Sequence, residues 1–126
     1  MIYFVSTIFI ILIALSAMFK AISDLCADHY DVSVFSRFNP QFWDKNISWK
    51  NKWVGGDPIN GHKKGLKYWD PISDAWHISN GCMICSFIGA CFFTPTFLHP
   101  ILLFIISGVF FTIVFNTFYN HIFKIK

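Results

Sequence analysis

The fold is decided by residues 75–123, AWHISNGCMICSFIGACFFTPTFLHPILLFIISGVFFTIVFNTFYNHIF, a stretch without a single Asp, Glu, Lys or Arg. About 20 apolar residues are enough to span the hydrocarbon core of a bilayer, so this stretch is long enough for two spans. Near its middle, Pro95 and Pro100 in the sequence TPTFLHP predict a tight turn between two helices. We therefore expect transmembrane helices over roughly residues 75–94 and 98–121.

A second uncharged run, MIYFVSTIFIILIALSAMF, begins the chain at residues 1–19. It predicts a third transmembrane helix over roughly residues 2–22. A secretory signal peptide is the alternative, because ALSA at residues 14–17 offers small side chains near a cleavage point. No basic segment precedes the run, and it is longer than the apolar core of a signal peptide, so we favour an uncleaved helix.

Composition agrees with residence in a membrane. Hydrophobic residues make up 55% of the 126 residues and charged residues only 13%, whereas about a quarter of a soluble domain is charged. The length suits one domain. We therefore expect an all-α integral membrane protein with three transmembrane helices and an aromatic-rich interfacial segment, residues 24–74, between the first and second helices.

The distribution of cations predicts the orientation. Three spans place residues 24–74 and the C-terminus on one side of the membrane, and every Lys and Arg then lies on that side or at its border. Because positively charged loops stay in the cytoplasm, we expect the interfacial segment and the C-terminus inside and the N-terminus outside. The cations are Lys20, Arg37, Lys45, Lys50, Lys52, Lys63, Lys64, Lys67, Lys124 and Lys126.

The phrase FWDKNISWKNKW, residues 42–53, interleaves tryptophans with lysines. Tryptophan prefers the boundary between membrane and water, so we expect this segment to lie on the headgroup layer and to cap the helix bundle. The predicted partners are the lipid bilayer and an anionic lipid headgroup. Nucleic acid is not expected, because seven acids balance the seven cations of the segment. The residues expected to bind the headgroup are Trp49, Lys50, Asn51, Lys52 and Trp76.

Polar residues gather at two predicted helix ends. They are KAISDLCADHYD, residues 20–31, and DPISDAWH, residues 70–77, and three spans would place both at the same membrane interface. Carboxylates and imidazoles suit a divalent metal, which would polarise a phosphate or activate water. Alternatively, a carboxylate and an imidazole would transfer protons. The predicted metal ligands are Asp24, Asp28, His29, Asp74 and His77, and the predicted catalytic residues are Asp74, His77 and Asp24.

A purely structural interpretation of the same residues stays open. Asp74 suits the N-cap of the second span, and His77 suits a hydrogen-bonded packing residue. Asp24 follows Lys20 by four residues, the spacing of an ion pair along one helix face.

Small residues recur every four positions in the second span, at Gly81, Cys85 and Gly89. Such a stripe lets another helix approach closely, so it predicts a packing face and a route to a homo-oligomer. Cys82 and Cys85 form a CxxC inside this span, where packing is a better interpretation than redox or zinc chemistry.

The sequence FNPQFWDKNISWKNKW, residues 38–53, followed by SDAWH, residues 73–77, resembles a group of small uncharacterised membrane proteins of Bacteroidetes-type bacteria and their phages. The resemblance implies residence in a membrane, here a bacterial inner membrane, and it implies no chemistry. It also suggests that the two phrases belong to one site.

Two functional hypotheses follow. The first is an interfacial enzyme or metal-binding protein that acts on a lipid headgroup or a phosphorylated substrate. The second is a non-catalytic accessory subunit, or a phage-type factor that modifies the envelope.

Overall fold

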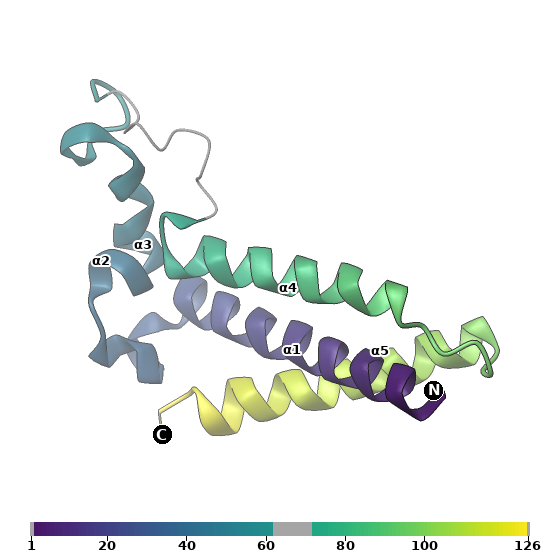
Figure 1. The fold of residues 1–126 in the computed structure, drawn as a ribbon. Coiled ribbons are helices and arrows are strands. Elements are labelled where there is room, and N and C mark those ends of the chain that lie inside the picture. The colour runs from purple at the N-terminus through teal and green to yellow at the C-terminus, as the bar shows by residue number, and fades with distance from the viewer. Residues whose placement is uncertain (1, 62–71, 126) are drawn as a thin grey trace.

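Three long helices form the membrane-spanning part of the molecule (Figure 1). The structure is a computed structural model that describes residues 2–61 and 72–125, apart from the side chains of Ile2 and Asn51. The helices are α1 (Ile2–Asp28), α4 (Ala75–Phe92) and α5 (Pro100–Thr117), and α5 continues into one π-helical turn (Phe118–Ile122). Each is long and apolar enough to cross a membrane. The predicted all-α membrane fold with three transmembrane helices is confirmed.

The ends of the helices differ from the predicted ones. α1 continues to Asp28, six residues past the predicted end, because its last turns are buried beneath the segment that follows and so need no lipid around them. α5 begins at Pro100, since proline suits the first helical position and His99 Nδ1 accepts a hydrogen bond from the Ile101 amide at 3.4 Å.

α1 lies between α4 and α5, and its contact with α4 is the main helix interface (Figure 1). Along α1, buried residues recur every four positions, at Ile13, Ala17, Ala21 and Leu25. Small side chains let the two helices approach closely. Ser16 Oγ donates a hydrogen bond across the interface to the Met83 carbonyl oxygen at 3.1 Å. This hydrogen bond and the small-residue face hold α4 on α1.

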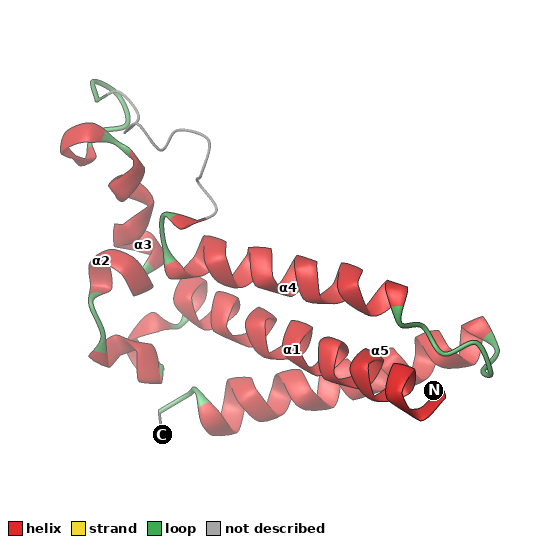
Figure 2. Ribbon diagram, viewed as in Figure 1, coloured by secondary structure: helices red, strands yellow, loops and turns green. Residues whose placement is uncertain are grey.

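The segment after α1 folds into short helical turns that we call the cap, residues 30–56 (Figure 2). It includes α2 (Pro40–Trp43), α3 (Lys45–Ser48) and four 3-10 turns. The 3-10 turns are Tyr30–Val32, Val34–Arg37, Trp49–Lys52 and Val54–Gly56.

Aromatic packing and main-chain hydrogen bonds attach the cap to one end of the helix bundle. Phe35 stacks on Trp43 with ring centroids 4.7 Å apart, and Phe35 is buried with Leu25 and Ala75. The Val34 amide donates to the Phe123 carbonyl at 2.7 Å, which ties the cap to the C-terminal tail. The predicted aromatic segment therefore lies at this end of the bundle, where Phe42 and Trp43 pack against the buried cluster. Its contact with the headgroup layer stays a prediction.

Candidate functional site at the capped end

Asp74 directly precedes α4 and is fully buried at the end of the bundle that the cap covers. Its carboxylate accepts a hydrogen bond from the His77 amide at 2.8 Å, so it is the N-cap of the helix. The same carboxylate lies 2.8 Å from Nδ1 of the His77 ring. The spacing of three residues therefore places the two side chains on one helix face, as expected from the sequence.

The Asp74–His77 pair has the geometry of a proton acceptor. A carboxylate beside Nδ1 favours the imidazole form that carries its proton there, which leaves Nε2 as the acceptor. The His77 side chain is 25% exposed, whereas that of Asp74 is 1% exposed. The aspartate thus orients the ring, and the histidine is the member of the pair that reaches the surface.

A cation lies beside this pair. Lys45 Nζ is 4.2 Å from the centre of the Trp76 ring, and the Trp76 ring meets the His77 ring edge to face at 4.6 Å between centroids. Cation–π contact of this kind holds an ammonium group in place without neutralising it. Sequence reasoning missed Lys45 as part of the site, because its contact with Trp76 joins two elements and no local spacing signals it.

The acids of the first helix do not belong to this pair. Asp24 forms an ion pair with Lys20 one turn earlier. Asp28 is exposed, and the exposed His29 ring lies edge-on to Tyr119 of the π-helical turn at 6.1 Å between centroids. These residues are therefore in different surroundings from the buried Asp74.

The predicted five-ligand metal set is not assembled. Within residues 2–61 and 72–125, no three His, Cys, Asp or Glu side chains lie close enough together to hold one metal ion. Asp24 pairs with Lys20 of its own helix, and Asp28 and His29 are exposed, so these three residues do not join Asp74 and His77. The structural alternative, an ion pair for Asp24 and a helix cap for Asp74, describes the observed contacts.

The residues expected to bind a headgroup divide into two places. Trp49 is 37% exposed and Lys50 is exposed, with Lys50 Nζ 5.8 Å from the centre of the Trp49 ring. Lys52 is half-buried, and Trp76 packs inward against the buried cluster under the cap. The Asn51 side chain lies outside the described part of the chain. Trp76 therefore belongs with Asp74 and His77, and Trp49 with Lys50 at the outer surface of the cap.

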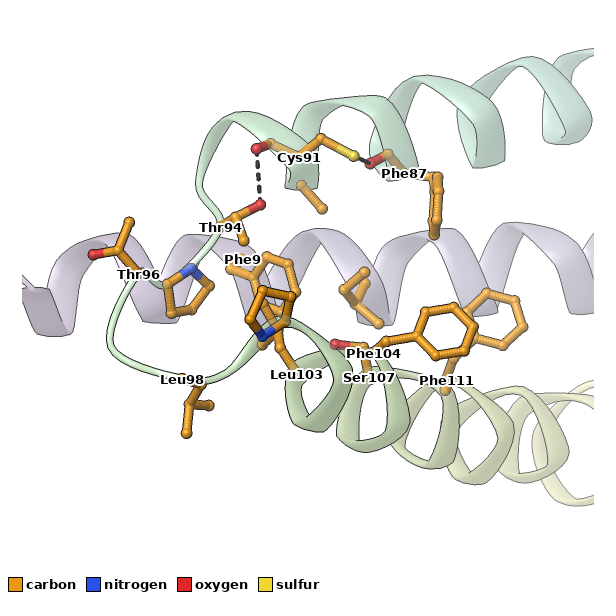
Figure 3. Close-up of a pocket in the computed structure, with 15 residues that line it drawn as sticks. Phe9, Phe87, Cys91, Thr94, Thr96, Leu98, Leu103, Phe104, Ser107 and Phe111 are labelled. Atoms are coloured by element: carbon orange, nitrogen blue, oxygen red, sulfur yellow. Dashed lines mark hydrogen bonds between the residues drawn. The ribbon is translucent and has the colours of Figure 1, made fainter.

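At the opposite end of the bundle the helices leave an apolar cavity of about 740 Å³ (Figure 3). The cavity lies beside the turn that joins α4 to α5, where Thr94 Oγ1 donates to the Cys91 carbonyl at 2.8 Å. Such an apolar space within the membrane-spanning region suits acyl chains. Nothing in the sequence periodicity signalled it. Its lining includes Phe9, Phe87, Cys91, Leu103, Phe104 and Phe111.

The small-residue stripe of α4 is divided between two surroundings. A Cβ placed on Gly89 would lie 3.5 Å from Cδ1 of Leu12, so Gly89 faces α1 of the same chain. Cys85 is exposed, and no described atom lies within 4 Å of a Cβ placed on Gly81. Gly89 thus serves the contact with α1, and contact of Gly81 and Cys85 with a second copy stays a prediction.

These features define a class: a small all-α integral membrane protein in which an aromatic cap closes one end of a three-helix bundle. Comparisons with protein-family models, with curated proteins and with solved structures each give no match. The resemblance carried by FNPQFWDKNISWKNKW and SDAWH therefore stays a prediction.

Proposed function

We propose that this chain is a membrane protein whose cap binds the anionic headgroup layer on the cytoplasmic face of a bacterial inner membrane. The observation that carries the proposal is the outer surface of the cap, where exposed apolar and basic side chains alternate. Phe38 and Trp49 are exposed there, next to the exposed cations Arg37 and Lys50. A surface of this kind places its rings at the acyl boundary and its cations against phosphates.

The same distribution of charge supports the orientation. The described cations Arg37, Lys45, Lys50 and Lys52 belong to the cap, and Lys124 pairs with the cap through its main-chain bridge to Ser33. The α4–α5 turn at the other end carries no Lys or Arg. The positive-inside rule therefore favours the cap and the C-terminus on the cytoplasmic side, with the N-terminus outside.

Quenching by brominated lipids tests the headgroup proposal. The full-length protein is placed in nanodiscs of phosphatidylcholine that contain equal amounts of phosphatidylglycerol, with bromine on one lipid or the other. We expect brominated phosphatidylglycerol to quench the tryptophan emission more strongly, because each cation near the surface attracts anionic lipid by about 1 kcal/mol.

The variant carrying Arg37→Gln, Lys50→Gln and Lys52→Gln is the matched comparison. It should lose the excess quenching by phosphatidylglycerol and keep the quenching by phosphatidylcholine, since its aromatic residues are unchanged. Equal quenching by the two lipids in the unmodified protein would contradict the proposal.

A second candidate function, proton transfer on a phosphorylated lipid, is favoured by one specific observation: buried Asp74 holds Nδ1 of the partly exposed His77 at 2.8 Å. His77 Nε2 would take a proton from the water whose oxygen forms a bond to phosphorus. It would return that proton to the headgroup oxygen as the bond from phosphorus to that oxygen breaks, so that the headgroup leaves as an alcohol. ³¹P NMR of nanodisc lipids incubated with the protein tests this. A new phosphorus signal that His77→Gln abolishes supports it, whereas identical spectra for both proteins exclude it for the lipids supplied.

A further inference from the structure

α5 is the helix that the rest of the chain covers least. None of its side chains is buried by the described residues, and its half-buried positions, which include Leu103, Ser107 and Phe111, face the bundle. The opposite face carries polar rather than purely apolar side chains. Thr112, Asn116 and Asn120 recur every four residues on that face, Gly108 precedes them at its edge, and all four are exposed. Gly108 also borders the apolar cavity. We call these four residues the polar stripe.

Hydrogen bonds connect neighbouring residues of the polar stripe, but they leave some of its donors and acceptors unpaired within the described part of the chain. Asn120 Nδ2 donates to Asn116 Oδ1 at 3.3 Å, and Asn116 Nδ2 donates to the Thr112 carbonyl at 2.9 Å. An amide side chain donates two hydrogen bonds and accepts two. The Asn116 amide therefore keeps one donor and one acceptor for a further partner, counted over the part of the chain that the structure describes.

Lipid offers no such partner. Asn116 lies six residues before the end of the third span at Ile122, which is about 9 Å along the helix axis. At that depth the acyl chains cannot hydrogen-bond, so amides in transmembrane helices bind neighbouring helices. The neighbour is not α1, because α1 contacts the other side of α5.

The geometry points to self-association: the polar stripe binds the same stripe of a second copy of this chain. Two copies inserted in the same direction are related by a twofold axis along the membrane normal, so each residue meets its own equivalent at the same depth. An amide is able to hydrogen-bond its own copy, donor to acceptor in both directions, which a cation or a carboxylate cannot do. The stripe is therefore complementary to itself.

Gly108 supplies the close approach that such a pairing needs. Apart from the backbone of its own helix, no described atom lies within 4 Å of a Cβ placed on Gly108, so the helix surface is open at this edge of the cavity. A glycine on the same face as interhelical hydrogen bonds lets two backbones come near each other. The corresponding stripe on α4 is less suited, because Gly89 already contacts Leu12 of the same chain.

Energy transfer between full-length copies tests the inference. Copies carrying a donor or an acceptor dye on an added C-terminal tag are mixed in liposomes, and transfer is followed as lipid is added to dilute the protein. We expect the unmodified chain to dimerise, Asn116→Leu to raise the dissociation constant about tenfold, and Asn116→Gln to retain most of the affinity. Gly108→Ile should weaken the dimer as well, because it blocks the approach of the second helix.

Thr117→Val is the matched control. It removes a hydroxyl from the same helix, and that hydroxyl bonds the Ile113 carbonyl of its own turn at 2.8 Å, outside the stripe. The control should leave the dissociation constant unchanged. Circular dichroism checks that each variant is folded, and Asn120→Leu substitutes for any stripe variant that is not.

Three results would overturn the inference. The first is transfer no greater than random proximity in the unmodified protein. The second is a dilution curve that Asn116→Leu and Gly108→Ile both leave unchanged. The third is a dimer that only Gly81→Ile disrupts, which would place the contact on α4.

Discussion

The two ends of the helix bundle are built by different means. At the capped end, Leu25, Cys26 and Ala75 are buried under Phe35, and main-chain hydrogen bonds join the cap to the C-terminal tail. At the end with the α4–α5 turn, the helices leave an open apolar cavity of about 740 Å³, and no side chain of α5 is buried by the described residues. The chain therefore covers the capped end with its own side chains, whereas the described residues leave the other end largely uncovered.

This difference indicates where stability and association reside. Substitutions beneath the cap should reduce the free energy of unfolding, because they remove contacts made within one chain. Substitutions on α5 should leave that free energy nearly unchanged and act on contacts made with lipid or with another copy.

The largest effect is expected from Leu25→Ala. Leu25 is fully buried, and truncating a buried leucine costs about 2–5 kcal/mol. Leu102→Ala on α5, where the side chain is 47% exposed, is the matched control and should cost less than about 0.5 kcal/mol. Unfolding titrations in mixed micelles, followed by tryptophan emission, measure both. Similar losses for the two variants would remove the contrast between the two ends.

A smaller loss is expected from Asp74→Ala. It removes the N-cap of α4, which is worth about 1–2 kcal/mol. Asp74→Asn retains an oxygen that accepts from the His77 amide, so it should recover most of the loss. Because the amide cannot hold the histidine ring as the carboxylate does, the ¹⁵N chemical shifts of His77 should change in both variants. Unchanged shifts in both would show that the ring is held by something else.

Trp43→Leu should lower the free energy of unfolding in two ways. It buries less apolar surface, and it removes the stacking of Trp43 on Phe35, which contributes about 1 kcal/mol more. Trp49→Leu tests the same chemistry at the outer surface of the cap, where the ring is 37% exposed, and should cost much less. The difference between their unfolding midpoints is the measurement. A larger loss at Trp49 would mean that the outer surface, not the stack, holds the cap.

The smallest effect concerns pH. Burial raises the pKa of the Tyr30 hydroxyl, and the nearby Asp44 and Asp31 carboxylates raise it further. A raised folded-state pKa means that this contribution to stability is complete below the unfolded value of about 10 and is lost as the pH rises through the folded value. Tyr30 Oη also donates to the Phe38 carbonyl at 3.0 Å. Tyr30→Phe should therefore flatten the alkaline decline of the unfolding midpoint, and an identical decline in both proteins would exclude Tyr30 as its cause.

The spans were predictable from the sequence because a membrane imposes one strong condition. Every backbone polar group must be satisfied within the segment, so long uncharged runs become helices. The helix ends were less predictable. α1 continues to Asp28 because the cap covers its last turns, and a hydropathy pattern cannot predict that another segment will cover a helix end.

The site was predictable only where one helix carries it. The spacing of Asp74 and His77 along one helix predicts that their side chains meet, and the structure shows this contact. Whether Asp24 meets Asp74 depends on how α1 and α4 are rotated about their axes, which no local spacing encodes. A signal for that rotation was present: Ile13, Ala17 and Ala21 recur every four residues and form the buried face of α1.

The most direct test of the fold is to measure on which side of the membrane each end of the helix bundle lies. Asn60→Cys, beyond the cap, and Thr96→Cys, in the α4–α5 turn, both lie at exposed positions. A maleimide that cannot cross membranes is applied to right-side-out and to inverted inner-membrane vesicles, with the unmodified chain as the baseline for its own cysteines. We expect Thr96→Cys to react in right-side-out vesicles and Asn60→Cys in inverted ones. Reaction of both cysteines from the same side would contradict a bundle whose capped and uncapped ends lie on opposite faces of one membrane.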